Sequence, residues 1–174
     1  MVKLDSHQHF WNFDPIRDNW ITEEMEVIRR DFLPSDLKPL LDANGILGCV
    51  AVQADQSEAE TDFLLDLASE HDFIQGIVGW VDLCLEQITE RLDYYSQFPK
   101  LRGFRHILQA ESPEFILRPE FQRGIAALQN YGFTYDILIY PKHLPQSIKL
   151  VQAHPDQLFV IDHLAKPDIK NGRF

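Results

Sequence analysis

The sequence predicts an α/β fold, a (β/α)8 TIM barrel of which this chain holds the first six units. Short apolar runs alternate strictly with longer amphipathic runs, which is typical of parallel strands joined by right-handed helical crossovers. The first strand ends in His-Gln-His-Phe-Trp, whereas an open nucleotide-binding sheet carries G-x-G-x-x-G there. A complete barrel needs eight units and about 250 residues, and this chain has 174. We therefore expect residues 1–174 to be a single domain that lacks its two C-terminal units.

Six runs have the length and apolar content of strands. The clearest is Gly-Cys-Val-Ala-Val-Gln at residues 48–53, a continuous apolar run that suits a strand buried on both faces. Pro141 follows the fifth run and closes it. The expected strands are Val2–His9, Gly48–Gln53, Ile77–Val81, Leu101–His106, Phe133–Tyr140 and Leu158–Asp162.

Six amphipathic runs alternate with these strands and predict helices. Ser35 and Gly45 suit the N-cap and the C-terminal end of the second helix. Pro119 suits the first turn of the fifth helix. The expected helices are Thr22–Arg30, Asp36–Asn44, Glu58–Glu70, Glu86–Phe98, Pro119–Tyr131 and Leu144–Ala153.

Composition and charge exclude several classes of protein. The formal charge is −11, from 16 basic and 27 acidic residues, which argues against a nucleic-acid binder. No apolar run reaches the ~18 residues that span a bilayer, and the N-terminus has no signal-peptide pattern. Two cysteines, Cys49 and Cys84, make no disulfide framework. We expect a reduced, cytoplasmic enzyme that acts on a small molecule, with no nucleic-acid or membrane partner; a homo-oligomer stays open.

The strongest candidate site is Asp5-Ser6-His7-Gln8-His9 at the end of the first strand. Residues two apart in a strand point to the same face, so His7 and His9 would aim two imidazoles into one space. At the carboxyl end of a barrel strand, that space is the active site. Two imidazoles there can bind a divalent metal or hydrogen-bond a developing oxyanion. The alternative is two ordinary histidines that happen to alternate.

Two further strand ends carry polar residues. The sixth strand runs into Asp162 and His163, which places His163 at the same rim, and Lys166 follows in the loop. The fourth strand carries Arg102, Arg105 and His106. Arg102 and His106 share a parity that Arg105 does not, and arginine is a natural clamp for substrate oxygens. Gln53, Tyr135 and Asp136 end or begin neighbouring strands and could add polar contacts. The alternatives are strand-end caps, solvated lysine and ion pairs with the abundant carboxylates.

At this point the sequence resembles the amidohydrolase superfamily, and within it the amidohydrolase-related lactonase branch. That branch contains L-fuconolactone and L-rhamnonolactone hydrolases and 2-pyrone-4,6-dicarboxylate lactonase. The likeness covers essentially the whole chain, with the motifs in family order. The matching stretches are Asp5–Trp11, Arg30–Leu37, Val52–Ala54 with Glu60–Thr61, Arg102–His106 and Asp162–Pro167.

The resemblance implies a barrel that hydrolyses a sugar-acid lactone. It implies His7, His9 and His163 as catalytic residues, and Arg102, Arg105, His106, Gln53 and Lys166 as substrate-binding residues. A single Zn²⁺ held partly by His7 and His9 is one alternative, and metal-free catalysis is the other. The chain departs from the family in two ways: the general-base aspartate of an eighth strand is absent, and no bridging lysine stands on the fourth strand.

Two other functions stay open at this stage. Related barrels also run isomerase and decarboxylase reactions. A chain without the general base could instead bind a ligand without turnover. Because six strands cannot close an eight-stranded barrel, we expect the isolated chain to be inactive.

Overall fold

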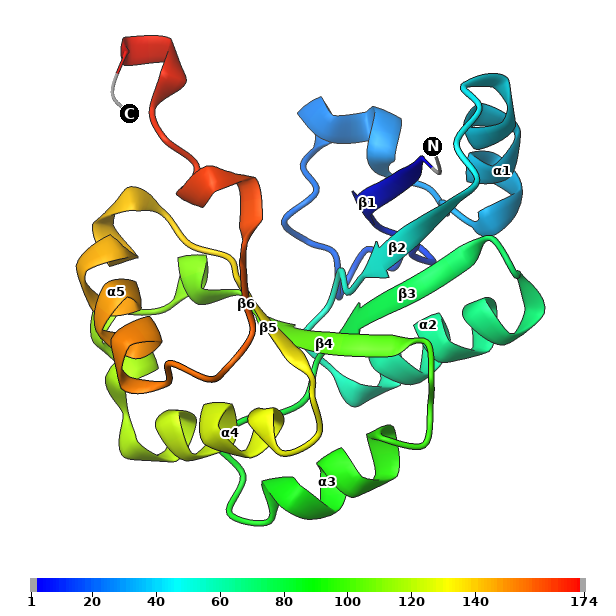
Figure 1. Cartoon of the computed structure of the whole chain (residues 1–174). Coiled ribbons are helices and arrows are strands. Elements are labelled where there is room, and N and C mark those ends of the chain that lie inside the picture. The colour runs from blue at the N-terminus through cyan, green and yellow to red at the C-terminus, as the bar shows by residue number, and fades with distance from the viewer. Residues whose placement is uncertain (1–2, 173–174) are drawn as a thin grey trace.

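The computed structural model describes residues 3–172. All six strands are parallel, and their order in the sheet follows the chain, β1-β2-β3-β4-β5-β6. The sheet curls into a half-barrel with α2 to α5 around its outer side (Figure 1). The strands are β1 Leu4–Gln8, β2 Gly48–Val52, β3 Ile74–Gly79, β4 Leu101–His106, β5 Thr134–Ile137 and β6 Phe159–Ile161.

The helices connect consecutive strands, as alternating β and α elements require. The structure confirms three expected ranges at both ends, those of helices α2 and α5 and strand β4. The expected helix at Thr22–Arg30 is instead a 3-10 segment, Glu23–Ile28, with no buried residue. The α-helices are α1 Pro34–Ala43, α2 Glu58–Glu70, α3 Ile88–Tyr95, α4 Pro119–Gln129 and α5 Leu144–Ala153.

The other α-helices and strands differ from their expected bounds by one to three residues at one or both ends. Helix α1 begins at Pro34, so Ser35 lies inside the helix and Leu33 takes the N-cap position that was expected of Ser35. Gly45 does follow the helix end with a φ of +62°, a conformation that suits glycine. Strand β1 begins at Leu4 in the described part of the chain; Val2, the expected start, lies outside the described residues.

The core lies between the sheet and the helices. Phe104 of β4 contacts the rings of Tyr95 and Phe133 at 5.7 and 5.0 Å between centroids. Phe121 of α4 lies 5.8 Å from Tyr135 of β5. Residues of the opposite parity point to the concave side of the sheet, so burial of this aromatic face leaves that side for polar side chains.

Close packing between helix and sheet depends on small residues. A Cβ on Gly124 of α4 would lie 2.2 Å from the carbonyl oxygen of Leu83, so only glycine lets the helix approach. None of the described helices is long and apolar enough to cross a membrane.

Candidate active site

Three imidazoles gather at the carboxyl end of the curled sheet. His7 of β1 lies 5.0 Å from His9 and 4.8 Å from His163 between ring centroids. His9 follows β1 directly, and His163 follows β6. Parallel strands of a barrel end on one face, and the expected meeting of the first and sixth strand ends is confirmed.

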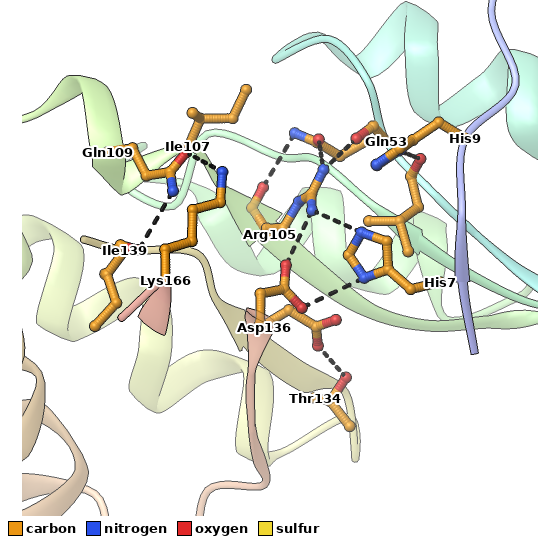
Figure 2. A network of polar contacts seen from close by, with 12 residues as sticks. His7, His9, Gln53, Arg105, Ile107, Gln109, Thr134, Asp136, Ile139 and Lys166 are labelled. Carbon is orange, nitrogen blue, oxygen red and sulfur yellow. Dashed lines mark hydrogen bonds and ion pairs between the residues drawn. The ribbon is translucent and has the colours of Figure 1, made fainter. Parts of the chain in front are cut away.

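The contacts of His7 determine where its proton lies (Figure 2). Its Nε2 lies 3.3 Å from Arg105 Nη1, and its Nδ1 lies 3.5 Å from Asp162 Oδ1. A guanidinium only donates hydrogen bonds, so Nε2 accepts and Nδ1 carries the proton toward Asp162. His7 is therefore held between a cation and a carboxylate.

Arg105 contacts His7, Asp162 and Gln53 and so connects the polar residues of the site. Its side chain is 4% exposed, and its Nη1 donates to Asp162 Oδ2 at 2.9 Å. Its Nη2 donates to the carbonyl oxygen and to Oε1 of Gln53, at 2.5 and 2.8 Å. Burial raises the pKa of Asp162, but hydrogen bonds from His7 and Arg105 outweigh burial and bring it below the usual value. A buried charge is thus paired and hydrogen-bonded, as stability requires.

His9 is held separately from the ion-pair network. Its Nδ1 donates to the carbonyl oxygen of Val52 at 2.7 Å, which leaves the Nε2 lone pair free to accept a proton or a hydrogen bond. Burial, and then the nearby charge of Arg105, lower its pKa to about 4. His9 is therefore a neutral imidazole at physiological pH.

His163 is exposed and sits on an unusual backbone. Residues 163–166 all have positive φ, between 51° and 59°, although none is glycine. This left-handed run follows Asp162, which is buried, and turns the imidazole toward His7. Burial, and then the charge of His7, lower the pKa of His163.

The structure does not bring every expected residue to this group. Arg102 is exposed near the start of β4. His106 faces the helix side, where it stacks on Phe115 at 5.0 Å, and burial lowers its pKa. Lys166 Nζ donates to Gln109 Oε1 at 3.3 Å, away from His7 and His9 (Figure 2). Gln53 contacts Arg105 and so acts through it.

Asp136 of β5 lies on the concave side with Arg105, its register partner. Its Oδ1 accepts from Thr134 Oγ1 at 3.2 Å. Burial, and then the charge of Asp162, raise its pKa to about 6. From the sequence, Asp136 could be either a polar contact of the site or a structural residue. Its position early in the strand did not show which groups it would face.

Three of these residues could hold a metal ion. Among the described residues, His7, Asp162 and His163 each offer a ligand atom, and these atoms lie within 4.8 Å of one another. Imidazole nitrogen and carboxylate oxygen are ordinary zinc ligands, so the donor types fit such an ion, which would replace either the Nδ1 proton of His7 or its contact with Arg105. The set shares His7 with the expected pair but does not include His9, whose Nδ1 donates to Val52 and whose Nε2 has no partner among the described residues.

A cavity of about 630 Å³ adjoins this group. His9 and Arg105 form one end, and the segment after β1, including Trp11 and Trp20, forms a wall. Sequence reasoning did not find this wall; its signal was the concentration of tryptophan, arginine and aspartate at residues 11–20. A space of this size accommodates a small-molecule ligand.

Comparison with known proteins places this geometry in a family. The amidohydrolase family model matches residues 4–174. The chain belongs to the amidohydrolase family. The coordinates of an amidohydrolase from Burkholderia multivorans with bound zinc superpose with a TM-score of 0.91 at 40% identity, over 96% of this chain and 59% of that one. An amidohydrolase from Bifidobacterium longum subsp. infantis, at 22% identity and a TM-score of 0.70, shares the fold; the match covers 95% of this chain and 62% of that one.

Two curated relatives carry a functional name. The L-fucono-1,5-lactonase of Burkholderia multivorans is 40% identical over 168 residues, which is 95% of this chain and 56% of the relative. The L-fucono-1,5-lactonase of Burkholderia ambifaria is 36% identical over 172 residues, 98% of this chain and 59% of the relative. The chain thus spans somewhat more than half the length of these relatives.

Proposed function

We propose that this chain carries the substrate-activating half of a hydrolase that opens a sugar-acid lactone by attack of water on the ester carbonyl. The observation that carries the proposal is the set of three imidazoles around a buried arginine beside a cavity. Identity of 36–40% to two lactonases supports the substrate class. Lactone opening develops negative charge on the carbonyl oxygen, and a buried, preorganised cation stabilises such charge.

Each residue of the site has a separate role in lactone opening. Arg105 borders the cavity, and its positive charge stabilises the negative charge that develops on the carbonyl oxygen without a direct clamp on the substrate. His9 offers a neutral Nε2 that accepts a hydrogen bond from water or substrate. His7 and Asp162 fix the guanidinium, Gln53 orients it, and His163 and Lys166 lie at the rim.

A metal ion bound by His7, Asp162 and His163 would supply Lewis-acid polarisation of the carbonyl and acidify a bound water. We further propose that the six units are the first six of an eight-unit barrel in one domain. In that barrel, the aspartate that takes the proton from water would follow the eighth strand, and the six-unit chain alone would not turn over.

The test compares proton release from aldonolactones by two forms of the protein. One is the 174-residue chain, and the other is the chain fused to the C-terminal part of the Burkholderia multivorans lactonase that it does not span. We expect turnover only in the fusion, with a loss of at least ~100-fold in His7→Asn and His9→Asn and none in His71→Asn. Near-normal turnover in the His7 or His9 variant would refute these roles. Carbon dioxide release without acid production would indicate a decarboxylase instead.

A further inference from the structure

The cavity beside Arg105 has the mixed lining of a small-molecule site. Trp11, Trp20 and Ile21 give it aromatic and aliphatic walls, and a few charged residues stand among them. Pockets of this kind bind through apolar contact and gain specificity from a small number of polar groups. The charged residues therefore decide which ligands enter.

Both arginines that line the cavity are already paired. Arg17 donates to the two carboxylate oxygens of Asp18, from Nε at 2.9 Å and from Nη2 at 2.8 Å. Arg105 donates to Asp162 at 2.9 Å. A carboxylate on a ligand would have to compete with these internal partners, so neither guanidinium is available as a clamp for an anion.

The remaining charged groups of the lining are acidic. Asp55, at the turn between β2 and α2, is half-buried, and its carboxylate makes no hydrogen bond or ion pair with any described residue. Glu60 is buried and accepts a hydrogen bond from the backbone N–H of Ala54 at 2.9 Å. Asp55 therefore presents to the cavity a carboxylate that no hydrogen bond engages, with Arg17 near enough to attract it. This carboxylate accepts hydrogen bonds from hydroxyl groups and repels a ligand carboxylate.

Two N–H donors on the lining residues have no acceptor among the described residues. They are Trp11 Nε1 and Arg105 Nε, both shielded from water. A buried donor without an acceptor is unfavourable, but because water does not reach either nitrogen, a ligand in the cavity contacts them only after a side-chain movement. The cavity itself therefore combines a free carboxylate acceptor with aromatic walls.

We propose that Asp55 makes this cavity discriminate against lactones that carry a carboxylate. The proposal rests on the proposed function, since it assigns the substrate class of the same site. Asp55 is a specificity residue: it faces the ligand but takes no part in opening the ester.

The experiment measures binding to the 174-residue chain, so it does not depend on turnover. The probes are L-galactono-1,4-lactone, which has the ring configuration of L-fuconolactone, and L-galactaro-1,4-lactone, in which the terminal CH₂OH is a carboxylate. Tryptophan fluorescence reports occupancy, since two of the three tryptophans, Trp11 and Trp20, line the cavity, and calorimetry gives a second measurement. We expect the neutral probe to bind about tenfold tighter or more at low ionic strength, and added salt to reduce the ratio.

Asp55→Asn keeps the shape of the side chain and removes its charge. We expect it to reduce the preference for the neutral probe by roughly threefold to tenfold, mainly by tightening the carboxylated one. Asp156→Asn, an exposed aspartate in the turn before β6, is the matched control and leaves the ratio unchanged. Should Asp55→Asn not fold, the salt dependence of the wild-type ratio tests the same charge.

The outcomes separate this proposal from the proposed function. Equal or tighter binding of the carboxylated probe, or binding of neither probe, overturns the selection proposed here. A ratio that neither Asp55→Asn nor salt changes overturns the role of Asp55. Tight binding of the neutral probe without acid release by the fused protein leaves the selectivity in place and refutes the lactonase assignment.

Discussion

Asp136 makes the stability of this protein depend on pH in an unusual direction. The side chain is buried on the concave side of β5, near Asp162 and Arg105. Burial, and then the charge of Asp162, raise its pKa from 3.8 to about 6. Between these two values the folded state binds this proton more firmly than the unfolded state does.

The magnitude follows from the shift. A difference of about two pKa values corresponds to about 3 kcal/mol, since one pKa unit is worth about 1.4 kcal/mol. Because the folded pKa is raised, this contribution is fully present below pH 3.8 and is lost as pH rises to 6. Asp136→Asn replaces the group with one that stays neutral, so the loss disappears.

We therefore expect Asp136→Asn to gain unfolding free energy relative to wild type as pH rises, by about 2.4 kcal/mol between pH 4 and pH 7. Urea unfolding of both proteins at pH 4, 5, 6 and 7 measures this difference. The exposed Asp156→Asn serves as a control with no such trend. A difference that stays constant across this range, or that falls as pH rises, would show that Asp136 does not titrate as reasoned.

Three further outcomes follow from packing and charge. Arg105→Lys loses the planar fork that contacts its carboxylate and amide partners, and unfolding in urea should show a loss of roughly 2–4 kcal/mol; wild-type stability would contradict this. Gly124→Ala places a Cβ 2.2 Å from the Leu83 carbonyl oxygen and should destabilise by about 1–3 kcal/mol in the same assay; an unchanged midpoint would show that helix α4 shifts freely. His163→Asn should weaken zinc binding in calorimetry by at least about tenfold, while His71→Asn should not; equal zinc affinity in both variants would remove His163 from the ligand set.

Strong local patterns made most elements predictable. The α2 range Glu58–Glu70 has regular apolar spacing, and Ser57 caps it by accepting a hydrogen bond from the Glu60 N–H at 3.2 Å. Pro99 precedes Leu101–His106, and Pro141 and Pro155 flank Leu144–Ala153. Residues 22–30 carry acidic and apolar residues at helical spacing but bury none of them, so packing does not support a regular α-helix there.

The site was predictable where parity alone decides orientation. His7 and His9 alternate at a strand end and therefore meet. On β4, polar residues stand on both faces of the strand. The sequence pattern did not show that Arg105, rather than Arg102 and His106, points to the concave side. Phe104 decides the orientation of the strand, because its ring packs on the helix side and so turns Arg105 to the concave side. This packing depends on residues that are distant in the sequence, Tyr95 and Phe133.

The left-handed run at residues 163–166 has a consequence for affinity. Non-glycine residues in this conformation are disfavoured by about 1–2 kcal/mol each, so four in succession place His163 on a backbone that is intrinsically costly. Any ligand or ion that contacts this imidazole selects the same costly arrangement. Its dissociation constant therefore reports the conformational equilibrium of this short segment as well as the contacts made, and sequence changes in the segment would tune binding without altering a single contacting atom.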